Sequence, residues 1–239
     1  MWGILKNDYY TNTKMFRVTI LLLLAISIPF YIKVSASVLE DSVNLLLLNA
    51  GYFLISLYMF IIMGTLIGNA IKENEQTIWQ TYLATTKTGR KGYIAQKYIL
   101  AIVLYFVTGA YAWFVNEVAY QINGVCVSKS FILLFVIYFV FQAALELPCM
   151  LRFGTVYGGY IKIILMFAVI FGIIIYGLYG NIKLFSMENQ DKIIDWTLRL
   201  IGEGLNGPTA KKGILIAGIA TTVFYGASYA LSLATRKKL

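Results

Sequence analysis

The sequence KENEQTIWQTYLATTKTGRKGYIAQK, residues Lys72–Lys97, is a polar segment between two long apolar runs. One run ends at Ile71 and the other begins near Tyr98. Basic residues outnumber acidic ones in this segment, and short cationic loops between membrane spans stay on the cytoplasmic side. The segment therefore predicts both a membrane protein and its orientation.

The first half of the polar segment predicts a short amphipathic helix. Ile78, Tyr82 and Thr85 fall on one face at helical spacing, with Trp79 and Leu83 beside them. A cytosolic helix with an aromatic face, held between two spans, is typical of a docking element for a soluble partner.

The composition places the whole chain in the membrane. Of its 239 residues, 59% are hydrophobic and only 13% are charged, and the mean hydropathy is +0.74. Soluble domains are about half apolar and about a quarter charged. The apolar runs are long and unbroken, which favours helices over the alternating strands of a barrel. We therefore expect an all-α integral membrane protein.

The pattern predicts one transmembrane domain over 1–239 with six transmembrane helices. An N-terminal segment, 1–16, is expected to lie along the inner leaflet, and a polar segment, 181–212, is expected outside. A signal peptide is the rival for the first span, in which Pro29 predicts a kink. The expected spans are Arg17–Leu39, Val43–Ile71, Tyr98–Val118, Ser130–Met150, Ile161–Tyr179 and Gly213–Ala234.

The distribution of charge supports this topology. With both termini cytoplasmic, the inner loops carry the whole formal net charge of +9, and the outer segments are neutral. The inner loop between the fourth and fifth spans is expected to be 151–162, LRFGTVYGGYIK. The charge is thus explained by orientation, and no nucleic-acid partner is expected.

Few residues carry chemistry. The chain has no histidine, which excludes His-dependent triads and His-ligated metals, and no Walker A, GxSxG or CxxC motif is present. Cys126 and Cys149 lie near opposite ends of one expected span, too distant to pair. Gly64 and Gly68 form a GxxxG pattern that permits close helix packing. We expect neither enzymatic activity nor a cofactor or metal site in this chain.

Glu146 is the acidic residue that this topology places in or near the hydrocarbon. Gln142 lies one helical turn earlier on the same face, so the two form a possible intramembrane polar patch. One alternative is that the fourth span ends sooner and Glu146 either snorkels to the inner interface or pairs there with Arg152. The other is a role in a transport path or switch.

The polar segment also resembles a loop of ABC-2-type transporter permeases. The similarity rests on Glu73, Thr77 and Leu83, then on Thr86 to Arg90, Tyr93-Ile94 and Lys97-Tyr98, with Thr86-Lys87 where that family often has Leu-Pro. The resemblance implies a small six-span permease with an ABC-2-type (type V exporter-like) transmembrane domain. It also implies that the loop docks on an ABC ATPase subunit. The residues expected to dock are Glu73, Thr77, Trp79, Tyr82, Leu83 and Arg90.

The resemblance further implies the partners and the cargo. ATP and Mg would be bound by the partner ATPase, and a second permease copy, identical or different, would complete a transporter in the bacterial cytoplasmic membrane. The expected cargo is an amphipathic peptide, such as a phenol-soluble modulin or an antimicrobial peptide, exported from the cell or the membrane. Alternatives are bacteriocin or lantibiotic immunity, drug or lipid export, and a non-transporting scaffold that docks a soluble regulator.

Overall fold

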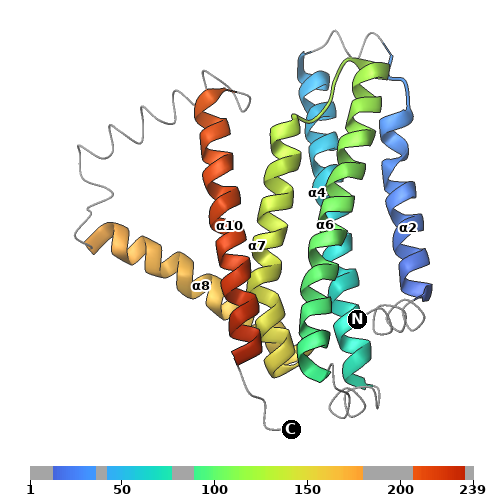
Figure 1. The fold of residues 1–239 in the computed structure, drawn as a ribbon. Helices are drawn as coiled ribbons and strands as arrows, with labels where there is room; N and C mark the ends of the chain where they lie inside the picture. Colours follow the sequence, from blue (N-terminus) through green and yellow to red (C-terminus); the bar gives the residue numbers. More distant parts are fainter. Residues whose placement is uncertain (1–12, 36–41, 77–88, 180–206, 235–239) are drawn as a thin grey trace.

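The computed structural model describes residues 13–35, 42–76, 89–179 and 207–234, and all regular structure within them is helical. Figure 1 shows long helices side by side, with α8 leaving the bundle at an angle. The predicted all-α class is confirmed. The elements are α2 (Thr13–Ser27), η1 (Ile28–Tyr31), α4 (Ser42–Gln76), α6 (Gly89–Asn123), α7 (Lys129–Phe153), α8 (Thr155–Tyr179) and α10 (Pro208–Ala234).

Five of the described helical segments are long and apolar enough to cross a membrane: Thr13–Tyr31, Val43–Lys72, Lys91–Asn123, Lys129–Phe153 and Pro208–Ala234. The apolar stretch described at the start of α8, Thr155–Ala168, is shorter. Successive helices α2, α4, α6 and α7 alternate in direction, and the start of α2 lies at the same end of the bundle as the end of α10 (Figure 1). The chain is thus a multi-pass helical membrane protein, and a sixth crossing stays a prediction.

The first span ends earlier than expected. Regular helix stops at Ser27, a 3-10 turn follows over Ile28–Tyr31, and Ile32 is extended. Pro29 has no N–H for the helical ladder. The side chain of Asn123, from α6, then holds the extended chain, donating to Ile32 O at 2.9 Å and accepting from Val34 N at 2.8 Å. The predicted span to Leu39 was therefore wrong beyond Tyr31 within the described residues.

Helices α4, α6 and α7 form the core of the bundle. Aromatic rings interlock between α4 and α7, where Phe53 meets Phe131 at 5.2 Å and Phe135 at 5.1 Å between ring centroids. Buried amides link α6 to its neighbours, since Asn116 Nδ2 donates to Ser56 Oγ of α4 at 3.0 Å. Apolar burial alone does not select partners inside lipid, so such ring packing and interhelical hydrogen bonds determine which helices associate.

The expected inner loop 151–162 is mostly helical. Only Gly154 separates α7 from α8, with φ +85°, a conformation that glycine adopts at little cost. Helix α8 then crosses back over α7 at Gly158, where a Cβ would lie 2.6 Å from the Met150 Cα. A loop was predicted because the stretch is rich in glycine. Here glycine instead permits a sharp reversal and a close backbone contact.

Candidate functional site

A groove of about 1020 Å³ opens between α4, α7 and the start of α8. We call it the α4–α8 groove. One part of its lining is apolar and aromatic, comprising Phe53, Leu57, Ile61, Tyr105, Phe131, Leu134, Phe135, Tyr138, Phe139 and Met150. The other part is polar and includes Thr65, Asn69, Lys72, Gln142, Glu146, Thr155 and Lys162. The groove is therefore amphipathic along its length.

The aromatic part of the groove is a preformed wall. Phe139 of α7 lies 5.7 Å from Tyr105 of α6 and 5.3 Å from Tyr138 between ring centroids. Paired rings have defined geometries and few rotatable bonds, so they lose little entropy when an apolar ligand binds. This part of the groove suits an apolar chain or helix face.

The polar part centres on an ion pair between α7 and α8. Lys162 Nζ donates to Glu146 Oε2 at 2.7 Å, and the two side chains are only 14% and 24% exposed. The pairing with Arg152 that the sequence left open was wrong. The helix does not end before Glu146, because α7 continues to Phe153, and Arg152 is exposed beside the Phe153 ring. Lys162 was missed because its segment was expected to be a loop, whereas α8 turns back across α7.

The structure brings Gln142 and Glu146 to the same groove, as their i, i+4 spacing predicts. Their role in transport stays a prediction. Lys72 also lines the groove, so its lining carries two lysines and one carboxylate. In a low-dielectric surrounding, such charges attract the polar groups of an amphipathic ligand strongly.

The GxxxG pattern lies along the same groove. Gly64 and Gly68 both line it, and a Cβ on Gly64 would lie 3.2 Å from the hydroxyl oxygen of Tyr105. A Cβ on Gly68 would meet only the end of the Met150 side chain, at 4.0 Å. Within this chain the pattern therefore widens the groove beside α6 and α7 and does not bring two backbones together.

A second polar cluster, which was not predicted from the sequence, fixes α10 against α6 and α7. Ser228 Oγ donates to Ala144 O, and the Tyr98 hydroxyl lies 2.7 Å from Ser228 Oγ and 2.8 Å from Ser232 Oγ. Pro148 lacks the N–H that would bond the carbonyl four residues earlier, which is that of Ala144. Ser228 thus satisfies the carbonyl that Pro148 leaves open. Pro148 was the available signal, since a freed carbonyl in a buried helix needs a donor.

Lys97 is another residue that the sequence placed differently. It was counted as a loop charge, but it lies in α6 with a fully buried side chain, and its Nζ donates to Ala70 O of α4 at 3.1 Å. The Tyr93 ring lies 5.2 Å from the same nitrogen. The helix begins at Gly89, about two turns earlier than expected, so Lys97 joins α4 and α6 below the apolar core.

The predicted docking residues cannot be assembled into a surface. Thr77, Trp79, Tyr82 and Leu83 lie outside the described residues, and the docking helix with them. Glu73 falls in the last turn of α4 and Arg90 in the first turn of α6, the two helices that the polar segment joins. The docking role stays a prediction.

Within the described residues, no three histidine, cysteine, aspartate or glutamate side chains cluster as a metal site would require. Cys126 and Cys149 are both free thiols. The main feature of the described residues is thus the amphipathic α4–α8 groove.

Comparison with known proteins adds one finding. A family model described as ABC-2 family transporter protein matches residues 3–235. No curated protein matches the chain, and no solved structure does.

Proposed function

Because the chain belongs to the ABC-2 family of transporter proteins, we propose that it is the permease subunit of an ATP-driven exporter of amphipathic peptides. The family supplies the permease role, and the α4–α8 groove is the observation that supports the cargo. An aromatic wall and a charged end in one groove suit a molecule that is apolar along one face and charged along the other. A peptide helix of this kind has both faces.

The proposed topology follows the charges. Helix α8 provides the sixth crossing, both termini lie in the cytoplasm, and the polar segment between α4 and α6 faces the same side. The end of the groove with Lys72 and Lys162 then lies at the cytoplasmic half of the membrane. Cargo would enter there from the cytosol or the inner leaflet.

The proposed energy source is a partner ATPase that binds ATP and Mg. The segment 77–88, with Trp79, Tyr82 and Leu83, docks on that subunit and transmits its closure to α4 and α6, with which the segment is continuous. A second permease copy completes the pathway. The buried Lys97–Ala70 contact between α4 and α6 lets the two helices move as one unit.

The experiment is reconstitution of the permease with its genetically neighbouring ATPase in proteoliposomes. We expect an amphipathic helical peptide to stimulate ATP hydrolysis in wild type, and Gln142→Leu to reduce this stimulation with basal hydrolysis retained. The control variant Phe141→Leu, at an exposed position of α7 outside the lining of this groove, should leave both rates unchanged.

Other outcomes select other functions. Stimulation by lipids or small drugs but not by peptides would favour the lipid or drug exporter. Loss of the ATPase from Trp79→Ala/Tyr82→Ala would support the docking segment. If no ATPase co-purifies with wild type, the exporter proposal fails and a non-transporting scaffold is favoured.

A further inference from the structure

A second groove, which we call the α6–α10 groove, lies on the other side of α7. It has a volume of about 950 Å³ and is formed by α6, α7 and α10. Its walls are aliphatic or aromatic over most of their length, with Lys129 and Lys211 at one end and no acidic side chain among the described residues that line it. The apolar lining includes Ile102, Phe106, Leu133, Val136, Ile137, Val140, Ile214, Leu215, Ile219, Val223 and Tyr225.

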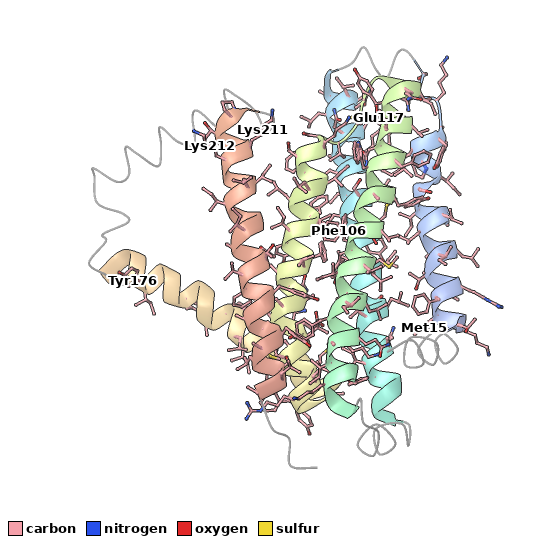
Figure 2. The ribbon with its side chains drawn as sticks, viewed as in Figure 1. Met15, Phe106, Glu117, Tyr176, Lys211 and Lys212 are labelled. Atoms are coloured by element: carbon pink, nitrogen blue, oxygen red, sulfur yellow. The ribbon has the colours of Figure 1, made fainter. Side chains whose placement is uncertain are left out.

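The groove runs along the helices. Lys211 lies at the start of α10, while Phe106 lies midway along α6 (Figure 2). From Lys211 to Tyr225 the helical rise is about 21 Å. The hydrocarbon of one leaflet is about 15 Å deep, half of the ~30 Å bilayer core. The groove therefore has the length of one lipid acyl chain together with part of its headgroup.

The charges at the lysine end are unbalanced. Lys129 Nζ is 3.2 Å from Glu117 Oε2, in a pair whose side chains are 65% and 42% exposed, and it lies 5.4 Å from the Trp113 ring centre. Lys211 has no ion pair with another described residue. Among the described residues, this end of the groove thus carries a net positive charge after the Glu117 carboxylate is included.

We propose that the α6–α10 groove binds one anionic phospholipid from the leaflet at the Lys211 end. The acyl chain lies between α7 and α10, and the phosphate lies between Lys129 and Lys211. An apolar helix from a second copy would fill the walls but would leave Lys211 without an anion among the described residues. An anionic phospholipid provides both an acyl chain for the apolar walls and a phosphate for the lysine end, and lipid surrounds the membrane-facing surface of the protein.

Two neighbouring lysines provide a matched test. Lys211 lines the groove and Lys212 does not, and Figure 2 shows them on different sides of α10. The full-length protein, purified in mild detergent, is titrated with phosphatidylglycerol or phosphatidylcholine and measured by native mass spectrometry. We expect wild type to bind one molecule of phosphatidylglycerol in preference to phosphatidylcholine. Lys211→Gln should weaken this binding about five-fold, equivalent to ~1 kcal/mol for one lysine at a membrane surface. Lys212→Gln should bind as wild type does.

A second pair of variants tests the apolar part. Gly218 lines the groove, and a Cβ there would lie 3.7 Å from Ile137 Cδ1, so leucine at this position would fill the space. We expect Gly218→Leu to lose the bound lipid while remaining monodisperse, and Gly226→Leu, outside the groove, to retain it. Equal binding of both lipids by wild type, or equal phosphatidylglycerol binding by Lys211→Gln and Lys212→Gln, would overturn the proposal. A wild type that binds no phosphatidylglycerol would also overturn the proposal, and would favour a protein helix as the occupant of the groove.

Discussion

The two ends of α7 carry ion pairs of the same type in opposite surroundings. Near Gly154, Glu146 and Lys162 lie 2.7 Å apart with largely buried side chains, and their ion pair joins α7 to α8. Near Lys129, the pair with Glu117 is longer, at 3.2 Å, and mostly exposed. Exposed pairs contribute about 0–1 kcal/mol, whereas removal of one partner of a buried pair costs several times more. The buried pair therefore contributes more to the stability of the fold than the exposed pair does.

The largest expected effect comes from breaking the buried pair. Glu146→Gln leaves the Lys162 ammonium without its counter-charge in a partly buried site, at a cost of about 2 kcal/mol, below the ~3–5 kcal/mol of a fully buried pair. We expect Tm in detergent to fall by about 4–8 °C, since ~1 kcal/mol shifts Tm by about 2–4 °C in chains of this size. Differential scanning fluorimetry measures this shift.

The control for that variant is Glu117→Gln, which removes the same charge from the exposed pair and should shift Tm by about 0–4 °C. The double variant Glu146→Gln/Lys162→Gln should recover part of the loss, because neither charge is then left alone. Equal shifts for the two single variants would show that the two ends of α7 do not differ as described.

The next effect tests the close crossing of α8 over α7. A methyl group at Gly158 would lie 2.6 Å from the Met150 Cα, which is closer than a van der Waals contact, so Gly158→Ala must displace α8. Overpacking of this kind costs about 1–3 kcal/mol. Gly159 is the control, because nothing lies within 4 Å of its added Cβ, and alanine there should be neutral or stabilising by up to ~1 kcal/mol. Thermal unfolding of the two variants side by side decides the point.

A smaller effect concerns the partner of the open carbonyl in α7. Ser228→Ala removes the donor to Ala144 O and should cost about 1 kcal/mol. In a Pro148→Ala background the helix can supply its own N–H to Ala144, so the same substitution should cost less. A double-mutant cycle on Tm measures the difference. Additive costs would mean that Ser228 does not compensate for Pro148.

Local sequence patterns predicted the helices and most of their extents, because an apolar run long enough to cross the hydrocarbon core indicates a membrane-spanning helix. They failed where one helix acts on another. The early end of the first span depends on Asn123, which is distant in sequence, and Lys162 reaches Glu146 only because α8 reverses at Gly154. The i, i+4 spacing of Gln142 and Glu146 was enough to place both on one surface. It could not name the partner charge, which comes from the next helix.

The smallest expected effect probes the exposed end of α7 through Cys126, which lies in the short connection between α6 and α7. Burial raises the pKa of its thiol, Glu117 raises that pKa further, and Lys129 lowers it. The reactive thiolate is thus scarcer at neutral pH than for an exposed cysteine, and maleimide labelling should accelerate as pH rises through the raised pKa.

Glu117→Gln removes one cause of the raised thiol pKa and should speed labelling at fixed pH, while Lys129→Gln should slow it. Each change in the labelling rate is about two-fold or less, because salt screens exposed charges. A Cys149→Ala background restricts labelling to Cys126, and opposite signs for the two variants are the required result. Equal rates would mean that the Glu117–Lys129 pair does not act on this thiol, and the exposed end of α7 would then be even less coupled than its ion pair indicates.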